Sequence, residues 1–483
     1  MNYSIKNICC IGAGYVGGPT MAMMAYKCPN LIFNVVDINK ERIAAWNAKD
    51  LSKLPIFEPG LKEIIASSRN KNLFFSSEIK EAIKSADVVF ISVNTPTKTK
   101  GVGAGKSSDL KWVEACAREV AKYSKGHTIV VEKSTLPVRT AEVIQKILNS
   151  PKTNFNGEKI SFSVLSNPEF LAEGTAINDL ENPDRVLIGG EDQKAMFKLA
   201  EIYKAWVPED KILFTNIWSS ELAKLTSNAF LAQRISSINS ISAICEVTGA
   251  DIREVSRAIG KDSRIGSKFL DSGPGFGGSC FKKDILNLVY LAEYFGLKEV
   301  AKFWEEVVNI NTWNQSRIAK IVVKKLFGTI SDKKIVILGF AFKANTNDTR
   351  ESAAIKICRD LIEEGAELVI HDPKVSQIQI ENDLKIKPLS NDYDKNSDSR
   401  DNNIGSWRFS NSLDIFENAN AVLVLTEWQE YKDIPWDLIA KQMIKPAWLF
   451  DSRSIVDYKL VKKTDLNFWR LGDGSQEEQK EKY

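Results

Sequence analysis

The chain has 483 residues, which is enough for about three domains with large buried cores. Its 65 Lys and Arg residues nearly balance 62 Asp and Glu residues, giving a formal net charge of +3. That balance excludes the strongly basic surface typical of nucleic-acid and membrane-surface proteins. Hydrophobic residues make up 43% and charged residues 26%, as in ordinary soluble globular proteins. No apolar run approaches 18 residues, so we expect no transmembrane helix.

The number and spacing of the histidines and cysteines limit the kinds of catalytic and metal site that the chain can form. The two histidines, His127 and His371, have no second His or Cys at ligand spacing, so no metal site is expected. The seven cysteines are odd in number and show no C-x-x-C spacing, which indicates a reducing compartment, and the cytoplasm is the expected location. Any catalysis must therefore rest on Cys, Lys, Asp, Glu or a cofactor.

The first part of the chain alternates between apolar strands and helices. Continuous apolar strands of this kind predict a parallel sheet covered on both faces. The expected elements are a helix over Pro19–Tyr26 and strands over Ile8–Ile11, Asn34–Asp37, Ala86–Val93, Thr128–Val131 and Phe162–Ser166.

A long helix is predicted next, over Trp218–Val247. This stretch has no proline, and apolar residues recur at three- and four-residue steps until Gly249. Such a helix joins domains or forms a subunit interface. Further helices are expected over Asp284–Phe295 and Val300–Phe327.

A weak internal repeat follows. Lys334–Gly339 (KIVILG) echoes Asn7–Gly12 (NICCIG), and Glu367–Pro373 (ELVIHDP) echoes Asn34–Ile38 (NVVDI). The second copy predicts the same plan of strand, turn and helix, but it lacks the later glycines that admit a pyrophosphate.

The predicted fold is therefore α/β, with two doubly wound Rossmann-like domains joined by a long central helix and a helical domain, and a cleft between the two. The expected parts are a first Rossmann domain over 1–215, a helical or dimerisation domain over 216–328, a second Rossmann-like domain over 329–472 and a polar tail over 473–483. A polar surface insert is expected over 391–403.

The glycine-rich turn Gly12-Ala13-Gly14-Tyr15-Val16-Gly17 is a G-x-G-x-x-G between a strand and a helix. Gly12 suits the tight turn, Gly14 the approach of a pyrophosphate, and Gly17 close packing of helix on strand. Asp37 ends the next strand, where it would bond a ribose diol and repel a 2′-phosphate. This favours NAD over NADP, while a turn without a ligand is the minor alternative.

Polar residues also follow later strands, in Asn94–Thr97 and Glu132–Thr135, where ligands of an open sheet bind. Ordinary turn chemistry explains each of these about as well. Glu169 and Glu173 are expected on one helical turn, begun by Asn167-Pro168 and ended by Gly174. That pair is either a solvated acidic edge or a proton-handling group.

Lys224 and Asn228 lie four residues apart on the long helix. A lysine there usually extends its ammonium to solvent, unless it stabilises a developing alkoxide. The strongest local signal is the segment Gly273–Asp284 (GPGFGGSCFKKD), whose glycines precede Cys280 at the start of a helix. A helix N-terminus and nearby lysines favour the thiolate, so Cys280 is a candidate nucleophile with Asp284 on the same face. The other six cysteines are expected to be buried.

In this order, the segments resemble the nucleotide-sugar dehydrogenase family, within it the branch that oxidises UDP-glucose. The resemblance spans about Ile5 to Leu471 and is carried by the motifs GAGYVGGP, VNTPT, EKST, SNPEFLAEG, ELAKL-x-x-NAF, GFGGSCF-x-KD, GFAFK, DTRES and FDSR. Asp271 departs from the family, in which relatives often carry Lys or a small neutral residue.

The resemblance implies NAD-dependent oxidation of UDP-glucose to UDP-glucuronate, with two NADH formed per sugar. In the family's scheme, the Cys matching Cys280 holds the aldehyde and then carries a thioester that water hydrolyses. Lys224 and Asp284 match residues that stabilise an oxyanion and orient water. Glu169 matches a proton-transfer residue, and Thr135 a residue near the reacting water.

The resemblance also assigns sets of site residues. The implied catalytic set is Cys280, Lys224, Asp284, Glu169, Thr135 and Asn228. The implied NAD contacts are Gly12, Ala13, Gly14, Tyr15, Val16, Gly17, Asp37, Arg42, Val93, Asn94, Thr95, Pro96, Thr97, Ser134, Thr135, Glu173, Lys283 and Arg350. The implied UDP-sugar contacts are Glu169, Phe170, Leu171, Ala172, Glu173, Lys224, Asn228, Arg264, Asp271, Ser272, Gly273, Pro274, Gly275, Phe276, Gly277, Phe342, Lys343 and Arg453.

Arg453 resembles a family arginine that reaches a neighbouring subunit's site, which implies a homo-oligomer, either a dimer or a hexamer. Relatives acting on GDP-mannose or UDP-N-acetylmannosamine are the alternative, together with a 3-hydroxyacid dehydrogenase that would need neither Cys280 nor the second Rossmann-like domain. A non-catalytic sensor or scaffold would be expected to lack Cys280, Lys224 or Asp284, and all three are present.

Overall fold

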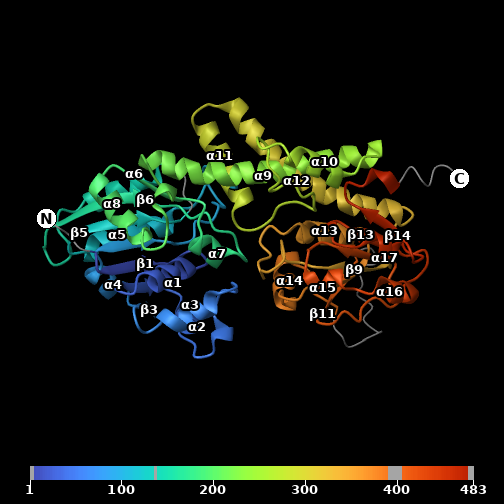
Figure 1. The fold of residues 1–483 in the computed structure, drawn as a ribbon, viewed down its shortest axis with the longest axis horizontal. Helices are drawn as coiled ribbons and strands as arrows, with labels where there is room; N and C mark the ends of the chain where they lie inside the picture. The colour runs from blue at the N-terminus through green and yellow to red at the C-terminus, as the bar shows by residue number, and fades with distance from the viewer. Residues whose placement is uncertain (1–4, 135–138, 390–404, 477–483) are drawn as a thin grey trace. The chain divides into compact units, whose positions relative to one another are not determined.

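The computed structural model describes residues 5–134, 139–389 and 405–476 (Figure 1). Thr135, the polar insert over 391–403 and the last residues of the predicted tail lie outside these ranges. The chain forms two compact units. Unit 1 comprises Met1–Ser227 and Leu286–Ala301, and unit 2 comprises Asn228–Ile285 and Lys302–Tyr483.

Unit 1 is built on an eight-stranded sheet in the order β3-β2-β1-β4-β5-β6-β7-β8. All neighbouring strands are parallel except β6 and β7, which are antiparallel. The first six strands have the 3-2-1-4-5-6 order of a doubly wound fold. The strands are β1 Asn7–Ile11, β2 Ile32–Val36, β3 Leu73–Ser76, β4 Val88–Ile91, β5 Gly126–Glu132, β6 Ile160–Ser166, β7 Val186–Gly190 and β8 Ile212–Thr215.

Helices cover both faces of this sheet because its strands are apolar on both sides. Cys10 of β1 packs with α1, α3 and α8, whereas Cys9 and Ile11 pack with α4, α5 and α6. The helices are α1 Gly17–Lys27, α2 Lys40–Trp46, α3 Leu61–Ser68, α4 Ile79–Ser85, α5 Lys111–Tyr123, α6 Thr140–Asn149, α7 Ala176–Glu181 and α8 Gln193–Tyr203, with short 3-10 turns η1 Leu51–Lys53 and η2 Glu209–Lys211.

Four helices follow: α9 Ile217–Thr248, α10 Ile252–Gly260, α11 Phe281–Tyr294 and α12 Lys298–Lys325. α9 begins in unit 1 and continues into unit 2. It confirms the predicted long helix to within one residue at each end, and it ends before Gly249, which has a φ of +78°.

Unit 2 repeats the same topology with an all-parallel sheet in the order β11-β10-β9-β12-β13-β14. Its strands are β9 Lys334–Leu338, β10 Glu367–His371, β11 Ser406–Ser410, β12 Ala421–Val424, β13 Trp448–Asp451 and β14 Asn467–Arg470. Its helices are α13 Ala353–Glu363, α14 Gln377–Leu384, α15 Gln429–Lys432, α16 Trp436–Gln442 and α17 Tyr458–Val461, with the 3-10 turn η3 Gly474–Gln476. The two sheets confirm the predicted pair of doubly wound domains, while the predicted domain boundaries stay predictions.

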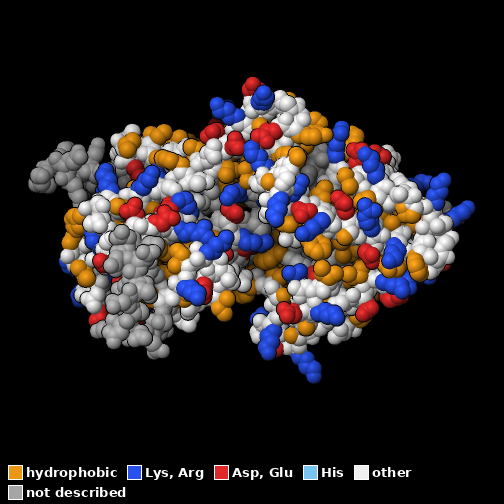
Figure 2. Space-filling model, turned by 180° about the vertical axis from the view of Figure 1, so that it is seen from behind, with side chains coloured by type: hydrophobic (Ala, Val, Ile, Leu, Met, Phe, Trp, Pro, Cys, Tyr) orange, Lys and Arg blue, Asp and Glu red, His pale blue; other side chains and the backbone are white. Residues whose placement is uncertain are grey.

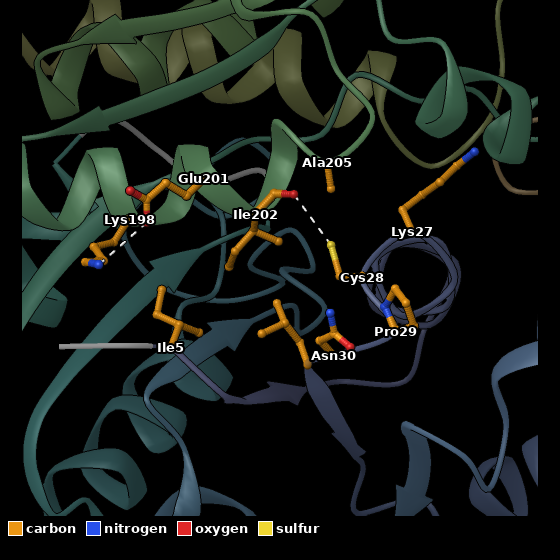
Figure 3. Close-up of a pocket in the computed structure, with 10 residues that line it drawn as sticks. Ile5, Lys27, Cys28, Pro29, Asn30, Lys198, Glu201, Ile202 and Ala205 are labelled. Carbon is orange, nitrogen blue, oxygen red and sulfur yellow. Dashed lines mark hydrogen bonds and ion pairs between the residues drawn. The ribbon is translucent and has the colours of Figure 1, made fainter. Parts of the chain in front are cut away.

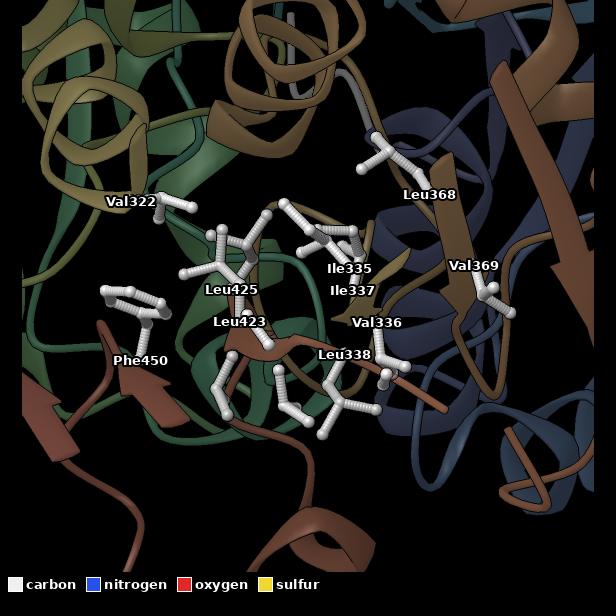
Figure 4. Close-up of a cluster of buried hydrophobic side chains, with 14 of the residues drawn as sticks. Val322, Ile335, Val336, Ile337, Leu338, Leu368, Val369, Leu423, Leu425 and Phe450 are labelled. Carbon is white, nitrogen blue, oxygen red and sulfur yellow. The ribbon is translucent and has the colours of Figure 1, made fainter. Parts of the chain in front are cut away.

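The core of unit 2 gathers around β9 (Figure 4). Val336 and Leu338 of that strand are completely buried, as are Leu423 of β12 and Phe450 of β13. Val322 of α12 packs into the same cluster, so this helix covers the sheet of unit 2.

The internal repeat is real but incomplete. Gly12 and Gly339 both have positive φ, and their N–H groups donate to the last residue of the neighbouring strand, at 2.8 Å in each case. Residues 12–16 separate β1 from α1, whereas residues 339–352 separate β9 from α13. The predicted plan of strand, turn and helix is therefore repeated, but the connection in the second copy is a longer loop that carries the DTRES segment.

The first residues of the predicted polar tail are packed against the rest of unit 2. Asp473 is 5% exposed and pairs with Arg470 at 2.6 Å. The Gly474 N–H donates to Ala250 O at 2.9 Å, so these first tail residues pack onto the α9–α10 connection. Pairing with the buried Arg470 guanidinium offsets part of the free-energy cost of removing the Asp473 carboxylate from water.

Acidic and basic side chains are interspersed over the face drawn in Figure 2, in keeping with the small net charge. Among the helices of the described ranges, none is long and apolar enough to cross a membrane.

Candidate active site

The glycine-rich turn of unit 1 has two crowded glycines and one open one. A Cβ on Gly12 would lie 2.2 Å from Ser92 O, and a Cβ on Gly17 would lie 2.1 Å from Gly12 O. A Cβ on Gly14 would meet no atom within 4 Å. Gly12 and Gly17 are thus required by packing, while Gly14 leaves space in front of the backbone at the start of α1. That space fits a dinucleotide pyrophosphate.

Asp37 lies beside this turn, directly after β2. Its Oδ2 accepts the Ala13 N–H at 2.9 Å and pairs with the Arg42 guanidinium at 3.1 Å. Its Oδ1 accepts the Asn39 N–H at 2.9 Å. The residues that the sequence assigns to the turn and to the ribose therefore come together, and the acid position suits a ribose diol.

Two further predicted cofactor segments meet at the carboxyl edge of the sheet. The Ser134 hydroxyl, after β5, donates to Val93 O at 2.7 Å, after β4. Thr95 is buried, and Asn94 and Thr97 are less so. Thr135, which belongs to the same predicted site, lies outside the described residues.

The expected helical turn around Glu169 is absent: residues 167–172 form a loop after β6. Asn167 does not cap a helix there, because its N–H donates to Glu132 O at 2.9 Å and its Nδ2 donates to Leu187 O at 2.8 Å. Glu169 is buried and Glu173 is partly exposed, so the two carboxylates do not form a solvated edge.

Glu169 and Lys224 form a buried ion pair. Glu169 Oε1 lies 3.2 Å from Lys224 Nζ, and each side chain is 5% exposed. Glu169 Oε2 is also buried, yet no hydrogen-bond partner for it occurs among the described residues. Burial of a charged oxygen without a partner is costly, so this atom is suited to a water molecule or a substrate group.

Two cationic side chains lie over the aromatic ring of Phe170. The Arg185 guanidinium stands 3.7 Å from the centroid of its ring, and Lys224 Nζ stands 5.4 Å away. Burial lowers the pKa of Arg185. Sequence reasoning missed Arg185, which lies outside every motif that it singled out.

Glu58 is a second residue that sequence reasoning missed. Its carboxylate accepts the N–H groups of Gly174 and Ala176, at 2.5 and 3.1 Å, and it accepts the Tyr15 hydroxyl. Burial and the neighbouring Glu58 raise the pKa of Tyr15. One buried carboxylate thereby joins the glycine-rich turn to the end of the SNPEFLAEG loop, next to Glu173.

In unit 2, Cys280 immediately precedes α11. Its carbonyl accepts the Asp284 N–H at 2.9 Å, and its Sγ lies 3.4 Å from the Ser279 hydroxyl. Cys280 is partly exposed, whereas the other six cysteines are buried, as expected. The predicted position of this thiol at a helix start is therefore confirmed.

Asn228 and Asp284 face each other. Asn228 Nδ2 donates to Asp284 Oδ2 at 2.6 Å, and both side chains are buried. Lys283 Nζ lies 3.9 Å from the other oxygen of Asp284. The catalytic residues predicted in this unit, Cys280, Asp284 and Asn228, thus lie together around the first turn of α11.

Three buried asparagines hold the glycine loop, and sequence reasoning found none of them. Asn311 bonds both the N–H and the carbonyl of Phe276, at 2.8 and 3.1 Å. Asn314 donates to Gly273 O at 2.9 Å, and Asn239 accepts the Gly273 N–H at 2.9 Å. The loop before Cys280 is therefore anchored by α9 and α12.

The other predicted UDP-sugar residues of unit 2 adjoin this loop. The Gly278 N–H donates to Arg350 O at 2.7 Å, and a Cβ on Gly278 would touch the Phe342 ring. Arg453 donates to Phe342 O at 2.9 Å and lies against Gly273.

Three predicted residues lie at the surface of unit 2. Lys343 is partly exposed, with Nζ 5.6 Å from the Phe342 ring centroid. Asp271 is exposed, and Arg264 pairs with Asp262 with its side chain 87% exposed. The contacts of Arg264 do not join it to the glycine loop.

A cavity of about 540 Å³ lies elsewhere in unit 1 (Figure 3). Its lining includes Ile5 before β1, Leu31 before β2 and Cys28 after α1. Because β1 and β2 are parallel, this is the amino-terminal edge of the sheet, opposite the glycine-rich turn. The cavity is therefore separate from the predicted cofactor site. No group of three or more His, Cys, Asp or Glu in the described ranges could hold a metal ion.

Comparison with known proteins agrees with this arrangement. The three domain models of the UDP-glucose/GDP-mannose dehydrogenase family match this chain: the NAD binding domain over residues 6–207, the central domain over 218–313 and the UDP binding domain over 336–458. UDP-glucose 6-dehydrogenase of Gallus gallus is 55% identical over 459 residues, which cover 94% of this chain and 90% of that protein. The Drosophila melanogaster enzyme of the same name is 52% identical over 469 residues, 96% of each chain.

Among solved structures, a UDP-glucose dehydrogenase from the archaeon Pyrobaculum islandicum is similar with a TM-score of 0.80, at 29% identity and over 98% of each chain. The chain is therefore an NAD-dependent oxidoreductase and belongs to the UDP-glucose/GDP-mannose dehydrogenase family.

Proposed function

We propose that the protein oxidises UDP-glucose to UDP-glucuronate through a thioester on Cys280, with two NADH formed per sugar. The observation that carries the proposal is the position of Cys280. It is the partly exposed thiol among buried ones, and it stands at the N-terminus of α11, which favours the thiolate. The UDP-glucose 6-dehydrogenases to which the chain is similar support the choice of sugar.

The proposed oxidation of the carbon-6 alcohol to the acid has four steps. The carbon-6 alcohol loses a hydride and a proton and becomes an aldehyde, to which the Cys280 thiolate adds. The resulting thiohemiacetal loses a second hydride and a proton to give the thioester. Water then adds to the thioester carbon, the carbon–sulfur bond breaks, and the carboxylate and the thiol are released. NAD, when bound, would supply the hydride acceptor for both oxidations.

The side chains have separate roles in this scheme. The Lys224 ammonium stabilises oxygen anions that develop at carbon 6. Glu169 accepts a proton from the hydrolytic water, and its unpartnered Oε2 is the atom suited to that contact. Asp284, held by Asn228, orients the same groups from the first turn of α11. Thr135 retains its assignment near the water as a prediction.

NAD would be held by the residues of the first doubly wound sheet. The open space at Gly14 and the start of α1 suit the pyrophosphate, and Asp37 suits the ribose. The segments around Val93–Thr97 and Ser134 border the nicotinamide end in this assignment. The glycine loop, Phe342 and Arg453 are assigned to the UDP-sugar.

The test is the number of NADH molecules released per UDP-glucose, measured by absorbance with limiting sugar and excess NAD. Two NADH per sugar are expected. One would contradict oxidation to the acid. Activity with GDP-mannose or UDP-N-acetylmannosamine alone would correct the substrate, and no activity with any nucleotide sugar would favour a sensor.

We also propose that two copies associate through the exposed apolar face of α9 and α12 in unit 2. This face carries Phe230, Ile244 and Val247 of α9 and Phe303 of α12, each more than half exposed. A second copy of the chain would bury it on both partners at once, as a symmetric interface does. Light scattering of Ile244→Glu is expected to give a smaller particle than wild type, whereas Ala258→Glu on exposed α10 should leave the mass unchanged.

Arg453 is bonded within its own chain, to Leu425 O and Phe342 O. Its reach into a neighbouring site therefore stays a prediction. Thiolate chemistry at Cys280 favours a reducing compartment, so the cytoplasm remains the proposed location.

A further inference from the structure

Lys133 is a buried cation that none of the assigned roles uses. It follows β5 directly and is 4% exposed. Its Nζ donates to Asn167 Oδ1 at 3.0 Å and to the Tyr203 hydroxyl at 3.3 Å. The Tyr203 hydroxyl donates to the same Asn167 oxygen at 2.6 Å. A buried lysine is costly unless it has a structural or chemical purpose.

Hydrogen bonds hold both the side chain and the backbone of Asn167. Besides accepting from Lys133 and Tyr203, its own amide donates to Leu187 O and its backbone N–H to Glu132 O. Glu169 follows two residues later. The hydrogen bonds of Lys133 thus end on the short segment that carries the Glu169 carboxylate.

Lys133 also interacts with Glu169 through its charge. Burial lowers the pKa of Lys133 to about 8, the Glu169 carboxylate opposes that change, and the Lys224 ammonium and the Cys10 thiol act in smaller measure. The groups that face Lys133 are therefore Asn167 and Glu169 after β6, Tyr203 of α8, Lys224 of α9 and Cys10 of β1. One buried carboxylate stands among two ammonium groups.

We propose that Lys133 is a positioning residue, which holds the Asn167–Glu169 segment in place for proton transfer and adds a second cation near the Glu169 carboxylate. The inference rests on the proposed role of Glu169. Lys224 alone can pair with Glu169, but Lys224 must also respond to charge that develops on the substrate. Lys133 is a second cation near this carboxylate, and its hydrogen bonds to Asn167 and Tyr203 hold it in place while Lys224 does so.

The test is the pH dependence of kcat in Lys133→Gln. Glutamine can still donate to Asn167 but carries no charge. Loss of a neighbouring cation disfavours a carboxylate, so the acidic limb of the profile should move to higher pH by about half a unit or more. Tyr203→Phe is the matched control, because it removes a hydrogen bond of the same cluster and keeps every charge. Its acidic limb should stay at the wild-type pH.

Results from the Lys133 and Tyr203 variants can each contradict the proposed role of Lys133. An unmoved limb in Lys133→Gln, or an equal movement in Tyr203→Phe, would overturn the proposal. Lys133→Met serves as a second uncharged variant, and if neither variant folds, Lys133 serves stability alone and the proposal is wrong. Glu169→Gln separates this result from the proposed function. Full activity there would refute the role of Glu169 itself, whereas a large loss there with no shift in Lys133→Gln would refute only the role of Lys133.

Discussion

Asn311 and Phe276 bond to each other in both directions. The Asn311 Oδ1 accepts the Phe276 N–H at 2.8 Å, and its Nδ2 donates to the Phe276 carbonyl at 3.1 Å. A Cβ on neighbouring Gly275 would lie 2.6 Å from that Oδ1, so the amide fits directly against the glycine. A side chain of α12 thereby replaces the backbone partner that a strand or helix would have given this loop.

Asn311→Leu should therefore weaken binding of the sugar nucleotide. The substitution removes two hydrogen bonds of about 1 kcal/mol each and leaves the Phe276 backbone groups unpaired. We expect KM for UDP-glucose to rise about tenfold or more, with a much smaller change in KM for NAD, in steady-state kinetics. Asn309→Leu on the same helix is the control, because Asn309 is exposed and its side chain, within the described part of the chain, bonds Glu306. Equal rises in both KM values would indicate general destabilisation instead.

The sheets and the long helix could be predicted because their signals are local. The apolar runs of β1 and β9 and the helical period of α9 lie within single segments. The glycine-rich turn and Asp37 could also be predicted, since their spacing encodes their geometry.

The anchors of the site could not be predicted in the same way. Asn311 lies 35 residues from its partner Phe276, and Glu58 lies 116 residues from Gly174. Such contacts follow from packing of distant elements. The expected helix at Glu169 failed for the same reason, since Asn167 bonds to β5 and β7 rather than capping a turn.

Substitution by alanine should weaken NAD binding at Gly14 and prevent stable folding at Gly12. At Gly14 a Cβ meets open space, so Gly14→Ala should keep the wild-type melting temperature and raise the Kd for NAD about tenfold or more, because the methyl group occupies the pyrophosphate space. At Gly12 a Cβ would collide with the Ser92 backbone at a φ of +112°, so Gly12→Ala should not yield stable protein. Calorimetric titration with NAD and thermal unfolding measure both effects. Unchanged NAD affinity in Gly14→Ala would place the pyrophosphate elsewhere.

Cys280→Ser should end net NADH formation and preserve UDP-sugar binding. A hydroxyl is a far weaker nucleophile than a thiolate, so the aldehyde is no longer held. Stopped-flow absorbance and calorimetric binding of UDP-glucose check the two halves of this prediction. Cys28→Ser is the control at a buried cysteine, where we expect wild-type turnover. Steady turnover in Cys280→Ser would exclude the covalent route.

Glu132 and Glu221 form a buried carboxyl pair that couples stability to pH. Glu221 accepts the N–H groups of Arg139 and Ala141 at the start of α6, at 2.7 and 2.8 Å. Burial, together with Glu221, raises the pKa of Glu132 well above its usual range, and burial raises the pKa of Glu221 to about 7. Between about pH 4.5 and 7 the folded chain thus holds protons that the unfolded chain has released. The free energy of unfolding contributed by this pair falls as pH rises through that window.

Glu132→Gln should remove much of this dependence, because an uncharged amide can donate to an ionised Glu221 at any pH. The melting temperature of the variant is expected to match wild type near pH 5 and to exceed it increasingly up to pH 8, as measured by calorimetry. Glu81→Gln is the control, since Glu81 is exposed on α4 and the Lys84 hydrogen bond lowers its pKa. Its difference from wild type should stay constant over the same range. A Glu132→Gln difference that is also flat would mean that Glu132 and Glu221 do not share a proton in the folded protein.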